Sequence, residues 1–491
     1  MSLQEKPRKR VSVVVNDAET SPRNTTKPVN PSTGPRFGCR HGQAILLCLA
    51  FLFGIGCRNN ISVALVAMTD NTTSLNPNIP YYDWNNTNVV ISAFYWGYIF
   101  CQVPAGYLGK TYGPKYFLLG SFLLNSFGCA LIPLMAEKFG STGVICCRVL
   151  QGICQGFLYP SIQVMLGTWA PSEERSTLNN FIYAGTTLGS IYGSLVTGYV
   201  SSSWLGWPYS FYILALFSFL WSILWLFLGY DSPAVHPRIT DEEKVYIQKS
   251  LKQEDDVDLP IPWRKIFACV PFYAAAFGMV GNTYGASILS AEAPTYLSKM
   301  MSFNIKSNAL IMTLPSCLGL TCSFFTGPLS DWLIRRQYLT RLWARRIFHL
   351  IGSFGYASCL LGLAFLTKSA AILSIVALGM TSVFAAFLLN GANINQLDLS
   401  PRFCGIIFAI LNAVSQCTAI IAPLIAQWVI TDKTDATQWR IVFGSGAASF
   451  MAGGVVFTLF SSATRQPWDG PTDKELEQRR KKISVISLTI T

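Results

Sequence analysis

Long apolar stretches alternate with short polar segments along most of this chain. Stretches such as 44–68, 117–135 and 372–395 reach the roughly 20 residues that a helix needs to cross a bilayer. The alternation predicts twelve membrane-spanning helices, at 44–68, 88–109, 117–136, 143–168, 178–200, 208–230, 267–295, 307–330, 347–367, 371–396, 403–428 and 440–461. We therefore expect an all-α integral membrane protein.

The polar segments divide the chain into parts. The longest internal one, 231–266, separates six predicted spans from six, and it begins a short surface helix with a capping box at Thr240 and Glu243. Gly-led loops after spans 2 and 8 recur at similar offsets, which indicates two six-span repeats with a binding site between them. We expect a disordered tail, a six-helix bundle, a linker, a second six-helix bundle and a second tail, at 1–40, 41–230, 231–266, 267–461 and 462–491.

Composition and charge agree with this organisation. Hydrophobic residues make up 51% of the chain and charged residues 13%, whereas a soluble domain carries roughly 25% charged residues. Of the 37 Lys and Arg, 29 fall on the side that holds both termini and five fall in the opposite loops. This positive-inside pattern places both termini in the cytoplasm. The net charge of +12 therefore reflects topology and contact with anionic membrane lipid, and it does not indicate a nucleic-acid partner.

Two arginines inside the predicted spans are the candidate substrate contacts. Arg58 lies deep in the first span and Arg148 lies in the fourth, both in the outer half. A mid-span arginine costs on the order of 3 kcal/mol on insertion scales, so such residues usually face a cavity. The alternative is that each arginine pairs with a buried acid and locks helices together. Glu292 is the one acidic residue inside a predicted span, so an excess positive charge remains that a small anion would balance.

Several polar residues accompany the arginines. Gln151 and Gln155 extend the helix face of Arg148, and they would bind substrate or bridge helices. Asn282, Tyr284 and Asn393 would line the cavity or join helices by hydrogen bonds. Glu292 would reach the membrane interface or couple transport to a cation, and Asn393 is a second candidate for ion coupling.

Other kinds of site are not indicated. The 14 cysteines lie almost entirely within the spans, so a disulfide framework is not expected. The sequence shows no phosphate-binding loop, no metal-ligand cluster and no His beside a nucleophile, so we expect neither an enzyme nor a cofactor. Asn71 and Asn85 stand in glycosylation sequons of the first outer loop.

The chain resembles the major facilitator superfamily and, within it, solute carrier family 17, the organic anion and sodium/phosphate transporters. The resemblance covers about residues 36–468. It rests on motifs along this range: Phe37-Gly-Cys-Arg-His-Gly42, Asn60-Ile-Ser-Val-Ala-Leu-Val-Ala-Met68, Phe94-Tyr-Trp-Gly-Tyr98, Gln102-Val-Pro-Ala-Gly106, Cys147-Arg-Val-Leu-Gln-Gly152, Trp169-Ala-Pro171, Glu174-Arg-Ser176, Gly206-Trp-Pro-Tyr-Ser-Phe-Tyr212, Pro294-Thr-Tyr296, Leu397-Asp-Leu-Ser-Pro-Arg402 and Gln466-Pro-Trp468.

The resemblance implies a major facilitator fold in which Arg58 and Arg148 bind an anion. It also implies a gating motif, at Gly106, Gly113, Glu174, Arg175, Gly327, Asp331, Arg335, Asp398 and Arg402. Gly109 and Lys110 stand where the first copy of this motif usually has an acid. Vesicular glutamate transporters differ at Ile91 and Asn282, and they and sialin have a glutamate where Gln155 stands. The Gln151 and Gln155 pair is similar to that of the sodium-dependent phosphate and urate branch.

We therefore expect a monomeric transporter of inorganic phosphate or a small organic anion, coupled to sodium on the basis of the resemblance. The alternatives are a proton-coupled carrier that uses Glu292, a voltage-driven organic anion carrier, and a passive anion conductance. The membrane would be the plasma membrane or an endolysosomal or vesicular membrane.

Overall fold

The computed structural model describes residue 35 and residues 37–69, 75–84, 86–251, 260–299, 305–366, 370–432 and 435–470. Within these ranges the regular structure is helical. Residues 1–34 of the expected first tail, residues 471–491 of the second and both sequon asparagines, Asn71 and Asn85, lie outside them.

The chain forms two groups of long helices joined by a linker. The first group comprises α1 (Cys39–Thr69), α2 (Thr87–Tyr112), α3 (Lys115–Gln155), α4 (Leu158–Trp169), α5 (Arg175–Ser201) and α6 (Trp207–Leu228). The linker carries α7 (Asp241–Leu251) and α8 (Trp263–Phe267). The second group comprises α9 (Val270–Lys299), α10 (Ile305–Arg335), α11 (Arg341–Phe365), α12 (Ala371–Leu388), α13 (Ala392–Leu399), α14 (Cys404–Val429) and α15 (Ala436–Phe460).

Each of the twelve predicted spans lies on helix, although most ends differ from prediction by a few residues and the fourth and tenth spans are divided. α3 reverses direction at Gly140, where φ is 60°, so one helix label covers the third span and the first part of the fourth. The fourth span then continues in α4, and the tenth is divided between α12 and α13 at 389–391. Eight stretches of described helix are long and apolar enough to cross a membrane, and one of them, 114–169, combines α3 and α4.

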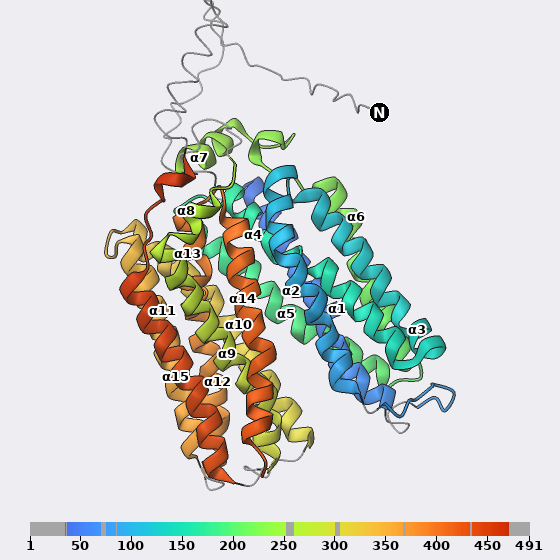
Figure 1. The fold of residues 1–491 in the computed structure, drawn as a ribbon. Coiled ribbons are helices and arrows are strands. Elements are labelled where there is room, and N and C mark those ends of the chain that lie inside the picture. Colours follow the sequence, from blue (N-terminus) through green and yellow to red (C-terminus); the bar gives the residue numbers. More distant parts are fainter. Residues whose placement is uncertain are drawn as a thin grey trace, which may run out of the picture.

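Figure 1 shows the two groups side by side, with α7 and α8 across one end. We call this end the α7 side. α2 and α4 pack against α14, and α5 packs against α10, so these helices form most of the contact between the groups. The groups lie close together near the α7 side and diverge toward the opposite side (Figure 1).

α5 packs closely on α1 because glycines line its contact face. Gly185, Gly189 and Gly193 recur every four residues, so they lie on one side of the helix. A Cβ atom on Gly189 would lie 2.6 Å from the backbone carbonyl oxygen of Leu52 on α1. Small residues let two backbones approach in this way, which is a common basis of helix association in membranes. The contact holds α1, which carries Arg58, against α5.

Glu243 of α7 attaches the linker to the start of α1. Its carboxylate accepts hydrogen bonds from the backbone N–H groups of Cys39 at 2.8 Å and Arg40 at 3.1 Å, so it caps the first turn of α1. Thr240 accepts a hydrogen bond from the Glu243 N–H at 3.3 Å, as the capping box predicts. A complete capping box would also have the Glu243 carboxylate accept a hydrogen bond from the Thr240 backbone N–H. Instead, that carboxylate accepts from the backbone N–H groups at the start of α1.

Replacing Gly189 with Val should separate α1 from α5 and destabilise the protein. Overpacking of this kind costs roughly 1–3 kcal/mol, so the thermal unfolding temperature of the purified protein should fall by several degrees. Gly198→Val is the matched control, because it lies on the same helix and its Cβ would meet nothing within 4 Å. Equal unfolding temperatures for the two variants would contradict the packing argument.

Candidate functional site

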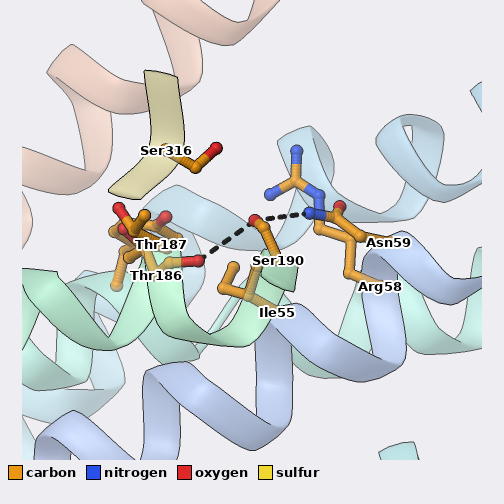
Figure 2. A pocket seen from close by; sticks show the side chains of 8 residues that line it. Ile55, Arg58, Asn59, Thr186, Thr187, Ser190 and Ser316 are labelled. Carbon is orange, nitrogen blue, oxygen red and sulfur yellow. Dashed lines mark hydrogen bonds between the residues drawn. The ribbon is translucent and has the colours of Figure 1, made fainter. Parts of the chain in front are cut away.

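An open cavity of about 290 Å³ lies between the two helix groups. Arg58 and Asn59 of α1 face Thr187 and Ser190 of α5, and Ser316 of α10 lies across from them (Figure 2). Both groups therefore contribute to the cavity. Its complete lining is Ile55, Arg58, Asn59, Tyr159, Thr186, Thr187, Ser190 and Ser316.

Arg58 is surrounded by aromatic rings of α2. Its guanidinium carbon lies 4.8 Å from the ring centre of Phe94, 4.9 Å from that of Tyr95 and 5.2 Å from that of Tyr98. Ring faces attract a cation and hold a flat guanidinium in place, but they do not neutralise its charge. Figure 2 shows the guanidinium pointing into the space beside Ser190 and Ser316. The donors of Arg58 are thus preorganised toward the cavity.

Arg148 lies directly behind Arg58. Its Nη1 donates to Gln151 Oε1 at 3.0 Å and its Nη2 donates to the backbone oxygen of Arg58 at 3.1 Å. Its guanidinium also lies 5.0 Å from the Phe94 ring centre, so both cations lie beside the same ring. Among the described residues, no carboxylate oxygen lies within 4 Å of either arginine. Two positive charges therefore share a site that has no acidic partner in the described chain.

The two glutamines have roles within the protein in this conformation. Gln151 is fully buried and orients Arg148. Gln155 donates to the backbone oxygen of Gly54 at 2.8 Å and to Asn125 Oδ1 at 3.1 Å. It thus joins the part of α3 after Gly140 to α1 and to the part of α3 before Gly140. Of the two uses that the sequence left open, the structure shows helix bridging for Gln155, whereas Gln151 contacts Arg148 within the same helix.

The other predicted polar residues do not line the cavity. Asn282 is half-buried on α9, and the Tyr284 hydroxyl shares a hydrogen bond with Ser445 Oγ at 3.3 Å. Glu292 is half-buried about two turns after Tyr284 on α9. The backbone oxygen of Asn393 accepts a hydrogen bond from Gln396 within α13. The structure therefore does not bring these four residues to the arginines.

Sequence reasoning missed the polar wall opposite Arg58. Asn59 Nδ2 donates to Ser190 Oγ at 2.9 Å, and Ser190 Oγ donates to the Thr186 backbone oxygen at 3.1 Å (Figure 2). The available signal was the helical spacing of Thr186, Thr187 and Ser190, which places hydroxyls along one face of a span. Small hydroxyls are also common in helix contacts, so only the fold distinguishes the two uses.

The two groups are fastened together on the α7 side by an ionic cluster. Asp398 at the end of α13 accepts from Arg175 Nη1 of α5 at 3.0 Å and from Arg345 Nε of α11 at 2.7 Å. Arg345 Nη1 also donates to Ser176 Oγ of α5 at 2.8 Å. All three charged side chains are buried. The expected gating residues Arg175 and Asp398 thus form a direct link between the groups. Arg345 joins this link from the first turns of α11, although the predicted span 347–367 leaves it in a loop.

Asp331 forms a second link next to this cluster. From the end of α10, its carboxylate accepts from the backbone N–H groups of Ser176 at 3.2 Å and Thr177 at 2.7 Å. A carboxylate at a helix N-terminus satisfies free donors and interacts favourably with the helix dipole. Gly327 permits the approach, because a Cβ atom there would lie 2.9 Å from the Ser176 carbonyl oxygen.

The first copy of the motif lacks this carboxylate contact. Gly106 packs α2 on α14, and its Cβ would lie 2.8 Å from Ile406 Cα. Lys110 places its ammonium group 5.0 Å from the Phe403 ring centre, just before α14 begins. Gly113 ends α2 with a φ of 85°, beside the Asp231 carboxylate. The contact between α2 and α14 thus includes close packing at Gly106 and the cation–π contact of Lys110. Asn412 of α14 adds hydrogen bonds to Tyr98 at 3.0 Å and to Gln102 at 2.9 Å on α2.

The remaining motif residues have separate positions. Glu174 binds Arg40, with 2.8 Å between Oε2 and Nε. Arg335 is exposed at the end of α10. Arg402 is half-buried, and its backbone N–H donates to Asp469 Oδ1 at 3.2 Å. Burial raises the pKa of the Asp469 carboxyl above its ordinary value.

The described residues contain no group of three or more His, Cys, Asp or Glu that could hold a metal ion.

The family model of the Major Facilitator Superfamily matches residues 46–344. The chain is 32% identical over 444 residues to a "Putative inorganic phosphate cotransporter" of Drosophila ananassae, covering 85% of this chain and 92% of that protein. It is 30% identical over 451 residues to sialin of Ovis aries, covering 87% and 90%.

A solved structure of the proton:xylose symporter XylE has the same fold. The TM-score is 0.66 at 16% sequence identity, with 90% of this chain and 98% of that chain covered. The family match and the solved structure agree with the helical fold described above. The chain therefore belongs to the major facilitator superfamily of membrane transporters and, within it, to solute carrier family 17.

Proposed function

We propose that this protein carries inorganic phosphate or a small organic anion across the membrane by alternating access. The observation that carries the proposal is the pair Arg58 and Arg148, which lie between the two helix groups with no described carboxylate within 4 Å. An arginine fork matches the oxygens of a phosphate or carboxylate. The name of the Drosophila relative supports the phosphate end of this range.

Arg58 is the direct substrate contact in this proposal, and Arg148 adds charge from behind. Asn59, Ser190 and Ser316 supply neutral hydrogen-bonding groups on the opposite walls of the cavity. Arg148 is held by Gln151 and by the backbone of α1, so a bound anion would draw α1 and α3 together. Ser316 would bring α10 of the second group into contact with the same anion.

The α7 side is the cytoplasmic side in this proposal, because the start of α1, the end of α15 and the basic linker lie there. The arrangement described above is then closed toward the cytoplasm, and the groups diverge toward the outside (Figure 1). Transport requires the links through Asp398 and Asp331 to break while the opposite ends of the groups approach. The site between the groups would then open to the cytoplasm.

Sodium is the coupling ion that we propose. Against an inside-negative potential, each imported negative charge costs about 2.3 kcal/mol per 100 mV, so uptake needs a driving cation. The oxygen atoms of Asn59, Thr186, Thr187, Ser190 and Ser316 gather around the cavity, and hard cations prefer neutral and anionic oxygen ligands. Glu292, the candidate for proton coupling, is not among the residues that line the cavity.

Arg58→Ala should remove saturable anion uptake by purified protein in liposomes. Each charge-assisted hydrogen bond contributes roughly 1.5–3 kcal/mol, so we expect a loss of more than about tenfold. Arg58→Lys should also be impaired, because an ammonium lacks the planar fork. Arg440→Ala is the control, since that arginine is exposed at the start of α15. Normal uptake by Arg58→Ala, with labelled phosphate, urate and glutamate each tried, would refute the site.

Imposed ion gradients test the coupling. An inward sodium gradient should drive accumulation of the labelled anion above equilibrium, whereas a proton gradient alone should not. Glu292→Gln should leave the pH dependence of uptake unchanged. Accumulation driven by protons and lost in Glu292→Gln would establish the alternative carrier, and flux that neither saturates nor shows countertransport would indicate a passive conductance.

Asp398→Asn should weaken closure on the α7 side, because it leaves the buried Arg175 and Arg345 without their counter-charge. Breaking a buried ion pair costs roughly 3–5 kcal/mol. Cys404 reports the opening, since its thiol is buried and lies 3.1 Å from the Gln163 backbone oxygen of the other group. Alkylation of Cys404, followed by mass spectrometry of its peptide, should accelerate more than about tenfold.

Asp435→Asn is the control for this measurement, because Asp435 caps α15 at the other end of the second group. An unchanged Cys404 alkylation rate in Asp398→Asn would show that the ionic cluster does not control closure.

A further inference from the structure

A second cavity, of about 470 Å³, lies on the α7 side. It occupies the place where the starts of α1 and α5 face the end of α10, and it shares no lining residue with the arginine cavity. Its volume falls within the roughly 300–1,000 Å³ of ordinary ligand pockets. No step of the proposed transport mechanism uses it.

The lining of this cavity changes from polar to apolar with depth. His41, Glu174 and Arg335 lie at the helix ends on the α7 side. The apolar residues lie farther along the same three helices, as Ala44 and Ile45 on α1, Leu178 and Phe181 on α5, and Pro328 on α10. This order matches the boundary between headgroups and hydrocarbon at a membrane surface. It suits an amphipathic ligand whose apolar part points into the membrane.

The polar end of the cavity favours an anionic group. Glu174 is engaged by Arg40 through two hydrogen bonds, Nε to Oε2 at 2.8 Å and Nη2 to Oε1 at 3.1 Å. Arg335 is exposed, and no carboxylate of the described chain lies within 4 Å of it. His41 Nδ1 accepts a hydrogen bond from the Gly38 N–H at 3.2 Å, so in the neutral ring Nε2 carries the proton and remains a donor. Arg40 is shared between Glu174 and Glu243 and is not available to a ligand. The exposed cation Arg335 and the donor His41 Nε2 therefore face the opening.

We propose that this cavity binds one anionic glycerophospholipid of the leaflet on the α7 side. Its phosphate lies at Arg335 and His41, and part of an acyl chain lies against Ile45, Phe181 and Pro328. Basic pockets between membrane helices on the cytoplasmic side are suited to anionic headgroups. Ile45 is 41% exposed, so the cavity wall is continuous with the surface that meets the bilayer.

The lipid would bind one conformation selectively. α1 and α5 belong to the first helix group and α10 to the second, so both groups must be in contact on the α7 side for the cavity to exist. A ligand that binds one of two conformations shifts the equilibrium toward it. Anionic lipid would therefore favour the arrangement in which the links through Asp398 and Asp331 are closed.

Native mass spectrometry of the full chain tests the proposal. The purified, delipidated protein is mixed with phosphatidylglycerol or with phosphatidylcholine of identical acyl chains. We expect one phosphatidylglycerol to be retained at concentrations where phosphatidylcholine is not. Arg335→Gln should weaken this binding about fivefold, the effect of one basic residue near anionic lipid. Ile45→Trp should fill the apolar end and abolish retention of the lipid.

Arg336→Gln is the matched control, because Arg336 is exposed beside Arg335 but does not line the cavity. Size-exclusion chromatography establishes that each variant is folded before binding is compared. Equal retention of the two lipids by the unsubstituted protein would overturn the proposal. Equal binding by Arg335→Gln and Arg336→Gln would also overturn it, as would displacement of the lipid by millimolar inorganic phosphate.

Discussion

The shared positive charge of Arg58 and Arg148 is the constraint on which the rest of the site depends. Two guanidiniums beside one Phe94 ring repel each other, and no described carboxylate lies within reach to offset them. The aromatic rings of α2, the Gln151 side chain and the backbone of α1 hold them in this arrangement. In the mechanism that we propose, an anion that enters the cavity balances this excess positive charge and couples its binding to the relative position of α1 and α3.

On the α7 side, too, few carboxylates serve several basic groups. Asp398 serves both Arg175 and Arg345, and Asp331 caps α5 from the opposite group. The contact between α2 and α14 has close packing at Gly106, Lys110 over the Phe403 ring, and hydrogen bonds from Asn412 to Tyr98 and Gln102. The two contacts between the groups are therefore built from different interactions.

Glu243 shows how the linker enters this arrangement. By capping α1 and binding Arg40, it connects α7 to the helix that carries Arg58, and Arg40 in turn holds Glu174 at the start of α5. The linker is therefore bonded to α1 directly and to the start of α5 through Arg40, so these contacts are with the first group. The second cavity lies beside this contact, where α10 completes its wall. The α7 side thus combines ionic links, a capped helix start and an amphipathic pocket in one layer.

The sequence by itself determined the membrane class, the span positions and the two arginines, because the cost of polar groups in hydrocarbon leaves long apolar runs with rare, visible exceptions. It also indicated Arg175, Asp398 and Asp331 through family motifs. Only the tertiary structure decided which polar residues meet. Thr186, Ser190 and Ser316 resemble ordinary helix contacts until α1, α5 and α10 are placed together. The predicted residues Asn282, Tyr284, Glu292 and Asn393 are not among those that line the cavity. Spacing along one helix defines a face, whereas the neighbour of that face depends on packing between segments far apart in the chain.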